Sequence, residues 1–440
     1  DAGTMNPIEH GEVFVTDDGD ETDQDMGNYE RFLECDLTSE NYMTTGRVYT
    51  SVIDNERSMK YKGKCVQVVP HIPEEIIRRI TSATKNHEAD ITIVEIGGTV
   101  GEYENILFLE AVRMMKQRDP KSVAVVLVSF LPVPSHIGEM KTKPTQHAAR
   151  QLNHAGIHPD IIVARGKMEL DEPRREKLAT FCGVKKEHCI SAPDVDSIYK
   201  IPLVLEEQKM GDTLLKILDI QKKKPTTDRW KKFVRKIEKA NKPLKIAVVG
   251  KYFGTGEYTL SDSYISVIEA IKHASWAHGA TPSLEWIDSE IFEKNSKKVS
   301  LLQEYDGIIV PGGFGTRGIE GIITSIQYAR EKKIPYLGLC YGMQLACVEF
   351  SRNVLKKKEA HTVEVDESTV HPIIIVNPTQ AKNVEEKRYG GTMRLGAYDC
   401  LLRKGTKVRA AYKKDSISER HRHRYEFNND YREEMDAAGL

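Results

Sequence analysis

The chain has 440 residues, a formal net charge of -1 and a pI of about 7.0, so its overall charge recommends neither a nucleic-acid nor a membrane partner. This length suggests two or three domains with sizeable cores. The seven cysteines form neither a C-x-x-C pair nor a metal-type cluster, which indicates reduced thiols and a cytoplasmic protein. No apolar stretch is long enough to span a bilayer.

In the first half of the chain, short apolar runs alternate with longer amphipathic segments. The runs are ITIVEIGG near Ile91, SVAVVLVSF near Ser122 and DIIVAR near Asp160. β-branched runs separated by segments such as PEEIIRRITSATKN favour a parallel sheet covered by helices. We therefore expect an α/β domain here.

Acidic residues gather in an opening segment, residues 17–25, and a further acidic residue, Glu95, ends the run near Ile91. Most acids in such a segment are expected to be solvated. Glu95 differs, because an acid that ends a buried apolar run needs a partner such as Mg²⁺. A carboxylate at a strand end beside a Gly-rich loop is also where doubly wound folds bind phosphates and metal.

A loop rich in cations and hydrogen-bond donors, EMKTKPTQHA, covers residues 139–148. Its two lysines, two threonines and glutamine would suit a triphosphate. Composition alone favours a plain surface loop instead, so the residues by themselves leave both interpretations open.

A lysine-rich stretch, residues 221–243, separates the two halves. Within it Trp230, Phe233, Val234 and Ile237 fall at helical spacing. A basic run also fits nucleic-acid binding, but no aromatic stacking set accompanies the charge, which favours a solvated interdomain helix.

A new α/β unit starts after this stretch with KIAVVGKY, and strand-like runs recur at DGIIVPGG, PYLGLC and HPIIIV. The segment PYLGLCYGMQ, residues 335–344, has the G-x-C-x-G form of a nucleophile elbow. The turn would hold Cys340 in a strained geometry at a helix N-terminus, where the dipole favours the thiolate. The following backbone N–H could stabilise an oxyanion, which suits acyl transfer.

The pentapeptide alone fits a buried structural cysteine equally well. A second glycine-rich strand end, IIVPGGFGTRG at residues 308–318, supplies another set of backbone donors. Together the two strand ends favour a working nucleophile.

PGGFG followed by GLCYGMQ resembles the class I glutamine amidotransferase domain, and the chain as a whole resembles the CTP synthase family. The motifs VEIGGTVG and KTKPTQ carry the second resemblance, which covers nearly all of the chain. It implies two α/β domains, each a mainly parallel sheet flanked by helices. A P-loop-like amidoligase domain would occupy residues 1–220 and a class I glutaminase domain residues 244–440, joined by the basic linker helix at 221–243.

The resemblance implies ATP-dependent amination of UTP to CTP, the last step of de novo CTP synthesis, with ammonia taken from L-glutamine. It also implies Mg²⁺ as cofactor, GTP as allosteric activator and a homotetramer. The partners would be small-molecule nucleotides and glutamine, with neither nucleic acid nor membrane.

In the amidoligase domain, the resemblance implies that Asp25 and Glu95 lie close together and hold Mg²⁺ against the nucleotide phosphates. His10 matches a segment beside the route of ammonia, and an ordinary polar histidine fits that position as well. ATP would contact Asp25, Pro193, Asp194 and Val195. The expected UTP and CTP site comprises Glu102, Tyr103, Glu104, Lys141, Thr142, Lys143, Pro144, Thr145, Gln146 and Lys177.

In the glutaminase domain, the resemblance makes Cys340 the nucleophile, with oxyanion N–H groups from Gly313 and Tyr341. An arginine and a glutamate suit the zwitterion of a free amino acid. The run ERHRHRYEFN, residues 419–428, is also a family feature; we place it outside the catalytic triad, as a structural or interdomain basic loop. The expected glutamine-binding residues are Gly313, Tyr341, Gly342, Met343, Gln344, Glu364 and Arg394.

The family's phosphate-binding loop and its His-x-Glu pair have no substitute in this sequence. GGTVGEYEN lacks a lysine, and His158-Pro159-Asp160 resembles the pair only superficially. We therefore expect this stretch to be inactive alone, the alternative being a non-catalytic paralogue that keeps the fold as a nucleotide-binding or assembly element. GMP synthase would lack KTKPTQ and VEIGGTVG, and Cys hydrolases of the chaperone/protease superfamily usually carry a histidine where Tyr341 stands.

Overall fold

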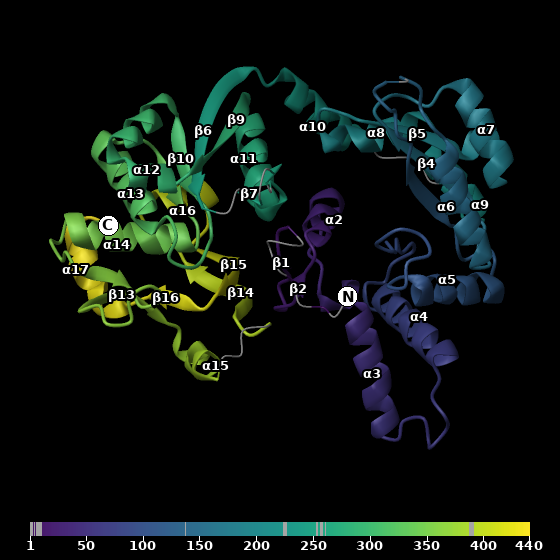
Figure 1. The fold of residues 1–440 in the computed structure, drawn as a ribbon, viewed down its shortest axis with the longest axis horizontal. Coiled ribbons are helices and arrows are strands. Elements are labelled where there is room, and N and C mark those ends of the chain that lie inside the picture. The colour runs from purple at the N-terminus through teal and green to yellow at the C-terminus, as the bar shows by residue number, and fades with distance from the viewer. Residues whose placement is uncertain are drawn as a thin grey trace. The chain divides into compact units, whose positions relative to one another are not determined.

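The computed structural model describes residues 3, 5, 11–136, 138–222, 227–251, 254–255, 258–259, 261–386 and 391–440, with backbone only at 254–255, 258–259 and 261–262. The chain divides into two compact units (Figure 1). Unit 1 comprises Asp1–Gly3 and Met43–Arg235, and unit 2 comprises Thr4–Tyr42 and Lys236–Leu440. The acid-rich opening segment therefore groups with unit 2. The domain limits given above stay predictions.

The sheet of unit 1 is parallel, with strand order β3-β4-β5. Its strands are β3 (Val126–Phe130), β4 (Ile161–Gly166) and β5 (Cys189–Pro193). The helices are α3 (Thr45–Arg57), α4 (Val68–Asn86), α5 (Ile106–Arg118), α6 (Lys143–His154), α7 (Glu172–Cys182), α8 (Ile201–Glu207), α9 (Met210–Ile217) and α10 (Asp228–Lys239), with short 3₁₀ turns η2 (Lys186–His188) and η3 (Ile198–Lys200).

Successive side chains of β4 point to opposite faces of this sheet. Ile162 and Ala164 join a buried cluster that includes residues of α6 and α7. Ile161 and Val163 join a second cluster, which α8 and α9 cover from the other side. A parallel sheet with helices on both faces is what the apolar runs predict.

The prediction of a strand over the run that begins at Ile91 is wrong. In the part of the chain that the structure describes, these residues pair with no strand, and Ile93 is 87% exposed. The neighbouring edge strand β3 likewise exposes Val128 and Phe130. An apolar pattern cannot show whether a second chain segment lies alongside to share its N–H and C=O groups.

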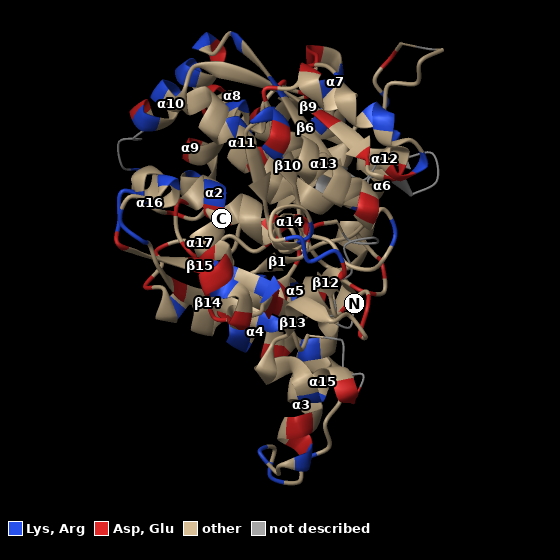
Figure 2. Cartoon of the chain, turned by 90° about the vertical axis from the view of Figure 1, so that its left-hand side faces the viewer, with Lys and Arg blue, Asp and Glu red and all other residues tan. Residues whose placement is uncertain are grey.

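The basic stretch forms a helix, α10, as predicted. The rings of Trp230 and Phe233 pack on Tyr199 at centroid distances of 6.2 and 5.2 Å, and the Trp230 indole N–H donates to the Tyr199 carbonyl at 2.7 Å. Val234 is buried on the same helix. Lysines and arginines lie among acidic residues along α10 and α3 in Figure 2.

The main sheet of unit 2 has four parallel strands in the order β11-β10-β6-β9. The strands of this unit are β1 (Phe14–Val15), β2 (Glu21–Thr22), β6 (Lys242–Gly250), β7 (Gly254–Thr255), β8 (Tyr258–Thr259), β9 (Ala280–Asp288), β10 (Gly307–Val310), β11 (Tyr336–Gly338), β12 (Ala360–Thr362), β13 (His371–Val376), β14 (Arg394–Leu401), β15 (Ser416–His423) and β16 (Tyr425–Phe427). The strands outside the main sheet form a three-stranded sheet, β12-β13-β16, and three antiparallel pairs, β1-β2, β7-β8 and β14-β15.

The helices of unit 2 are α2 (Asp25–Leu33), α11 (Ile265–Ala277), α12 (Glu290–Lys294), α13 (Ile319–Lys332), α14 (Tyr341–Asn353), α15 (Ala381–Glu385), α16 (Lys407–Tyr412) and α17 (Arg432–Ala438). The 3₁₀ turns are η1 (Ser39–Asn41), η4 (Ser261–Tyr264), η5 (Ser296–Glu304), η6 (Pro378–Gln380) and η7 (Asn429–Tyr431). The core joins β6 and β10 to α13 and α14 through residues such as Val249, Val310, Ile326 and Val348. It fixes the start of α14 against the main sheet.

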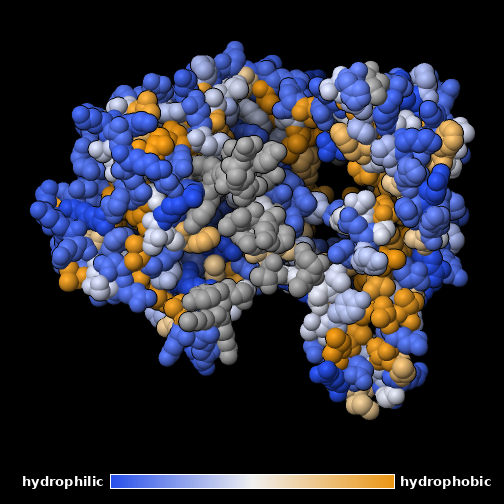
Figure 3. Space-filling view, viewed as in Figure 1, coloured by the Kyte–Doolittle hydropathy of each residue, from blue (hydrophilic) through white to orange (hydrophobic). Residues whose placement is uncertain are grey.

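Apolar side chains are also exposed in unit 1. Figure 3 shows hydrophobic residues gathered over α3, α4 and α5, and the exposed residues there include Ile53, Val68, Val69 and Ile106. Of the helices in the described ranges, none has the length and apolar character needed to cross a membrane.

Candidate functional site

Cys340 lies at the N-cap of α14, directly after β11, with φ 50° and ψ -106°. Glycine is required on both sides of it. A Cβ on Gly338 would lie 2.6 Å from the backbone of Gly342, and one on Gly342 would lie 2.1 Å from the Val310 carbonyl oxygen. A backbone held this way costs about 1–3 kcal/mol and persists only where the surroundings impose it. The strand–turn–helix geometry predicted from G-x-C-x-G is present.

The glycine-rich loop after β10 lies against this elbow. A Cβ on Gly312 would lie 3.6 Å from the Cβ of Cys340, and one on Gly313 would lie 3.7 Å from Cδ1 of Tyr341. The Tyr341 hydroxyl donates to the Gly315 carbonyl at 2.9 Å. The two glycine-rich strand ends therefore meet at the cysteine, as the sequence predicts.

Lys251, directly after β6, is a buried charge that the sequence analysis missed. Its Nζ donates to the Gly315 carbonyl at 2.5 Å and lies 4.6 Å from the centroid of the Tyr341 ring. Glu364 accepts a hydrogen bond from the Gly315 N–H at 2.9 Å. Burial lowers the pKa of Lys251 to about 8, although Glu364 acts in the opposite direction. The available signal was a lysine that ends an apolar run at the carboxyl edge of a parallel sheet.

The Cys340 side chain is open to solvent, so reagents can reach it, yet protein atoms crowd its surroundings. This desolvation raises the pKa of the thiol; the Tyr341 N–H and Arg422 lower it, and Glu364 adds to the rise. The expectation that the helix N-terminus favours the thiolate is therefore wrong as a net effect. A thiol in this state needs a base before it can attack.

The remaining predicted glutamine-binding residues divide into two groups. Tyr341, Gly342, Met343 and Gln344 form the first turn of α14, where the Gln344 amide donates to the Tyr425 carbonyl at 3.0 Å. Arg394 begins β14; its guanidinium lies 3.9 Å from the Tyr398 ring centroid and 3.7 Å from a Glu426 oxygen. The first group, with Gly313 and Glu364, surrounds the elbow, and the described contacts of Arg394 are with Tyr398 and Glu426.

In unit 1, the segment 141–146 spans the end of the loop after β3 and the start of α6. The hydroxyls of Thr145 and Ser129 lie 2.8 Å apart, which ties α6 to the sheet. The Gln146 amide donates to the Thr142 hydroxyl at 3.1 Å. The side chains of Thr142, Thr145 and Gln146 are buried, so they stabilise the conformation of the loop.

The cations of the same segment face outward. The Lys141 ammonium pairs with Glu139 at 2.9 Å, and the Lys143 ammonium lies 5.5 Å from the Phe181 ring centroid. Pro144 is exposed beside Lys143, and Lys177 is exposed on α7. These positive charges are accessible to an anionic ligand.

Pro193 to Val195 follow β5, and the Asp194 N–H donates to the Gly166 carbonyl at the end of β4 at 2.9 Å. Carboxyl ends of parallel strands share one edge of a sheet. The 193–195 segment therefore lies at the edge where the loop that leads to segment 141–146 begins. This is the edge at which doubly wound sheets bind ligands.

The loop that follows Glu95 is organised by the buried Asn105, whose amide donates to the carbonyls of Gly97 and Thr99 at 3.2 and 2.8 Å. Glu102, Tyr103 and Glu104 are exposed on it. Glu95 is exposed as well, so the premise that it ends a buried run is wrong.

The two predicted metal ligands belong to different units. Asp25 is the first residue of α2 in unit 2, and Glu95 lies in unit 1, so their approach stays a prediction. Over the described residues, no three His, Cys, Asp or Glu side chains form a metal-type group. Two exposed carboxylates nonetheless suit Mg²⁺, which prefers oxygen ligands and completes its shell with water and phosphate. His10 lies outside the described residues.

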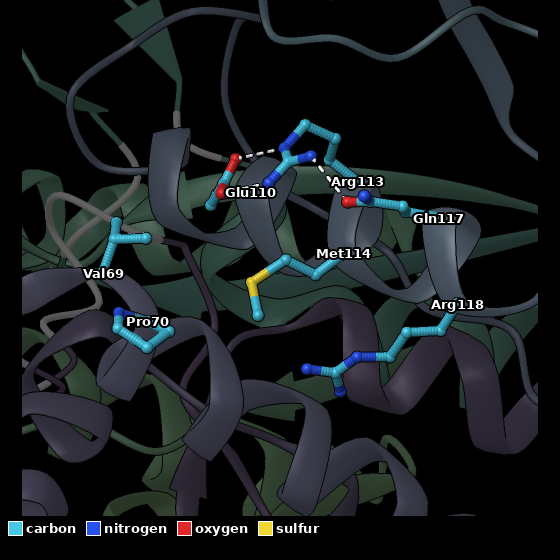
Figure 4. A pocket seen from close by; sticks show the side chains of 7 residues that line it. All are labelled: Val69, Pro70, Glu110, Arg113, Met114, Gln117 and Arg118. Atoms are coloured by element: carbon cyan, nitrogen blue, oxygen red, sulfur yellow. Dashed lines mark hydrogen bonds and ion pairs between the residues drawn. The ribbon is translucent and has the colours of Figure 1, made fainter.

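A separate cavity of about 470 Å³ lies between α4 and α5 in unit 1 (Figure 4). Its wall includes Glu110 and Arg113, which form an ion pair at 2.7 Å. None of the residues predicted to bind nucleotides lines this cavity.

Comparison with known proteins agrees with the geometry of both units. Residues 259–439 match the family described as glutamine amidotransferase class-I, which is the class that the elbow and its parallel sheet define. Residues 1–220 match the family described as CTP synthase N-terminus. The chain belongs to the CTP synthase family.

Relatives match over the whole of this chain. The CTP synthase of Pyrococcus abyssi is 49% identical over 441 aligned residues, which cover 100% of this chain and 80% of that protein. The CTP synthase of Halalkalibacterium halodurans is 47% identical, with 100% and 81% covered. A solved structure of the Trypanosoma brucei CTPS glutaminase domain with bound acivicin is 35% identical over 44% of this chain and 72% of that chain, with a TM-score of 0.40.

Membership in this family makes the protein a glutamine-hydrolysing ligase that forms CTP from UTP, with ATP, UTP and glutamine as substrates. One family match covers the synthase part in the first half of the sequence, and the other covers the glutaminase part in the second half.

Proposed function

We propose that Cys340 is the nucleophile that releases ammonia from glutamine. The observation that carries this proposal is its φ of 50° at the N-cap of α14, in contact with the loop after β10. The thiolate would attack the amide carbon, and the N–H groups of Gly313 and Tyr341 would bind the oxyanion. The C–N bond then breaks, the nitrogen leaves as ammonia after gaining a proton, and water hydrolyses the thioester to glutamate.

Glutamine would be held by the first turn of α14 together with Glu364 and Arg394. A carboxylate suits the α-ammonium group, and a guanidinium suits the α-carboxylate by paired hydrogen bonds. Glu364 is supported by its hydrogen bond from Gly315, which places its charge beside the elbow. Arg394 would have to share its charge between the substrate and Glu426.

Both nucleotides would bind at the carboxyl edge of β3-β4-β5. The UTP or CTP site would use residues 102–104, segment 141–146 and Lys177, and the ATP site would use Asp25 and residues 193–195. The exposed ammonium groups in these loops suit phosphate oxygens. ATP would phosphorylate O4 of UTP, and ammonia would then attack C4 and displace phosphate.

Asp25 and Glu95 would hold Mg²⁺ between them. When bound, this ion would neutralise charge that develops on the transferred phosphoryl group. The carboxylates would orient the phosphates, which is the main contribution of a protein to phosphoryl transfer.

We also propose a cytoplasmic homotetramer activated by GTP. All seven cysteines are free, which suits a reducing compartment. The exposed apolar surface over α3, α4 and α5 supports burial in an oligomer, for which sedimentation velocity is the test.

The nucleophile is tested by measuring CTP formation with glutamine and with ammonia as alternative nitrogen donors. In an intact parent protein that also carries the family's phosphate-binding loop and His-x-Glu pair, Cys340→Ala should abolish the glutamine-dependent reaction and leave the ammonia-dependent reaction nearly intact. Cys400→Ala, which removes another exposed thiol, is the matched control. Glutamine-dependent synthesis by Cys340→Ala would contradict the assignment. A protein that uses neither donor would fit the non-catalytic alternative.

A further inference from the structure

The side chain of Tyr341 is buried at the start of α14, with 2% of its surface exposed. The oxyanion role proposed above uses only the backbone N–H of this residue, which any amino acid except proline could supply. A buried tyrosine hydroxyl usually has a hydrogen-bond partner. Here the hydroxyl donates to the Gly315 carbonyl oxygen at 2.9 Å, so the side chain links the elbow to the loop after β10.

Gly315 is held through both of its polar backbone groups. Its N–H donates to the Glu364 carboxylate at 2.9 Å. Its carbonyl oxygen accepts from the Tyr341 hydroxyl at 2.9 Å and from Nζ of Lys251 at 2.5 Å. Gly315 has φ 77°, and glycine adopts many backbone conformations with similar ease. The three side chains therefore select the conformation of this residue.

Gly313, two residues earlier on the same loop, packs between two of these side chains. A Cβ on Gly313 would lie 3.7 Å from Cδ1 of Tyr341 and 3.8 Å from Cε of Lys251. These are ordinary van der Waals distances, so the Tyr341 ring lies against the Gly313 backbone. Tyr341 thus contacts the loop at two points, with its ring at Gly313 and with its hydroxyl at Gly315.

This two-point contact joins the two proposed oxyanion donors. One donor is the N–H of Tyr341 itself, and the other is the N–H of Gly313, against which its ring packs. Such donors stabilise the transition state only when they are aimed at the position that the negatively charged oxygen will occupy. That charge develops during the reaction, so their alignment affects kcat more than substrate binding.

We propose that the Tyr341 side chain is a positioning residue for glutamine hydrolysis. Its hydroxyl fixes the loop after β10 so that the Gly313 N–H is aimed at the oxyanion. The hydroxyl acts through Gly315 and Gly313 rather than by contact with the substrate. The inference rests on the proposed roles of Cys340 and of the two oxyanion donors.

The test is glutamate release by the intact parent protein used for the Cys340→Ala assay. Tyr341→Phe keeps the ring beside Gly313 and removes only the hydroxyl. Its kcat should fall on the order of fivefold, as expected for one lost hydrogen bond, while KM stays within about twofold. Tyr328→Phe, which removes a hydroxyl bonded to Gln303, is the matched control and should change neither quantity. An unchanged kcat in Tyr341→Phe would overturn the proposal.

Alkylation of Cys340 by iodoacetamide separates positioning of the oxyanion donors from an effect on the thiol. This reagent reacts at a saturated carbon, so no oxyanion forms. Tyr341→Phe should therefore be alkylated at a rate within about twofold of the parent, as followed by mass spectrometry of the Cys340 peptide. If alkylation slows as much as glutamate release, the hydroxyl acts on the thiol or on the fold as a whole, and the proposal fails.

A double variant tests the shared carbonyl oxygen. Only Tyr341→Phe combined with Lys251→Met removes both side-chain donors from Gly315, so kcat should fall by more than the product of the two single effects. A simple product would mean that the two donors act independently and would overturn the proposal. Cys340→Ala decides the nucleophile separately: if it abolishes glutamine use while Tyr341→Phe behaves as the parent, this inference alone is refuted.

Discussion

The buried ammonium group of Lys251 links the loop after β10 to the start of α14 in the candidate glutaminase site. It donates to the Gly315 carbonyl, lies over the Tyr341 ring and is balanced by Glu364. The cation holds the loop that would supply one oxyanion N–H against the helix that would supply the other. Its charge is costly to bury, which is why its pKa falls to about 8.

Lys251 should therefore give glutamine hydrolysis an alkaline limit. As pH rises through about 8, the ammonium loses its proton and its attraction to Glu364, so glutamate release should fall. Lys251→Arg keeps the charge and should move this limit to higher pH. Lys251→Met should lower kcat on the order of tenfold or more below about pH 8, where the parent carries the charge, since misaligned oxyanion donors cost this much. An alkaline limit that is the same in Lys251→Arg would contradict this role.

Glu75 is a second buried charge, on α4. Burial alone would raise the pKa of its carboxyl, but hydrogen bonds from Arg78, Ser51 and Arg79 lower it to about 2, well below its ordinary value of 4.5. A carboxyl group whose pKa is lower in the folded than in the unfolded protein stabilises the folded state at pH values above its unfolded pKa. This stabilisation is lost as pH falls from about 4.5 to about 2.

Glu75→Gln should thus lose at most about 3 kcal/mol of unfolding free energy at pH 7 and show a shallower acid dependence than the parent. Urea unfolding at pH 7 and pH 3 measures both. Glu56→Gln, at an exposed position of α3, is the control. Equal losses on acidification in Glu75→Gln and the parent would contradict the assignment.

Among helices, strands and turns, the sequence predicts those whose conformation depends on residues close together in the chain. The elbow at Cys340 could be foreseen because glycines, an apolar strand and a helix start occupy consecutive positions. The run at Ile91 could not, because a strand forms only against a neighbour. β15 was expected as a basic loop, since charged residues are rare in strands and the carboxylates that pair with Arg420 and Arg422 lie about 400 positions earlier.

The candidate site divides in the same way. Gly313, Glu364 and the first turn of α14 were found from motifs and do surround Cys340. Lys251 was missed, because no short motif contains it with its partners. Its role arises only when strands far apart in sequence bring their ends together.

The elbow itself offers a test at this scale. Gly342→Ala would place a methyl group 2.1 Å from the Val310 carbonyl oxygen, so β10 and α14 must separate. We expect a destabilisation of about 1–3 kcal/mol and loss of glutamine hydrolysis. The control is Gly211→Ala in α9, where a Cβ meets open space, and it should be neutral or stabilising by up to about 1 kcal/mol. Thermal unfolding and glutamate release are the measurements. Full activity in Gly342→Ala would show that the turn tolerates a side chain.

For the whole molecule, sequence order and spatial grouping differ. The chain changes units after Gly3, after Tyr42 and again after Arg235, inside α10. A basic helix between two α/β patterns is visible in the sequence, but the domain limits drawn from it stay predictions. The grouping of the opening segment with unit 2 is set by its pairing with β14 and β15, which depends on contacts with the end of the chain.

The aromatic cluster that anchors α10 has a practical consequence. Of the three tryptophans in the sequence, Trp230 belongs to unit 1, and Trp276 and Trp286 belong to unit 2. Replacing Trp230 by Phe leaves indole emission from unit 2 alone, and replacing the other two leaves emission from unit 1 alone. The chain thus carries separate intrinsic fluorophores for its two units, and the order in which they melt can be read without an added dye.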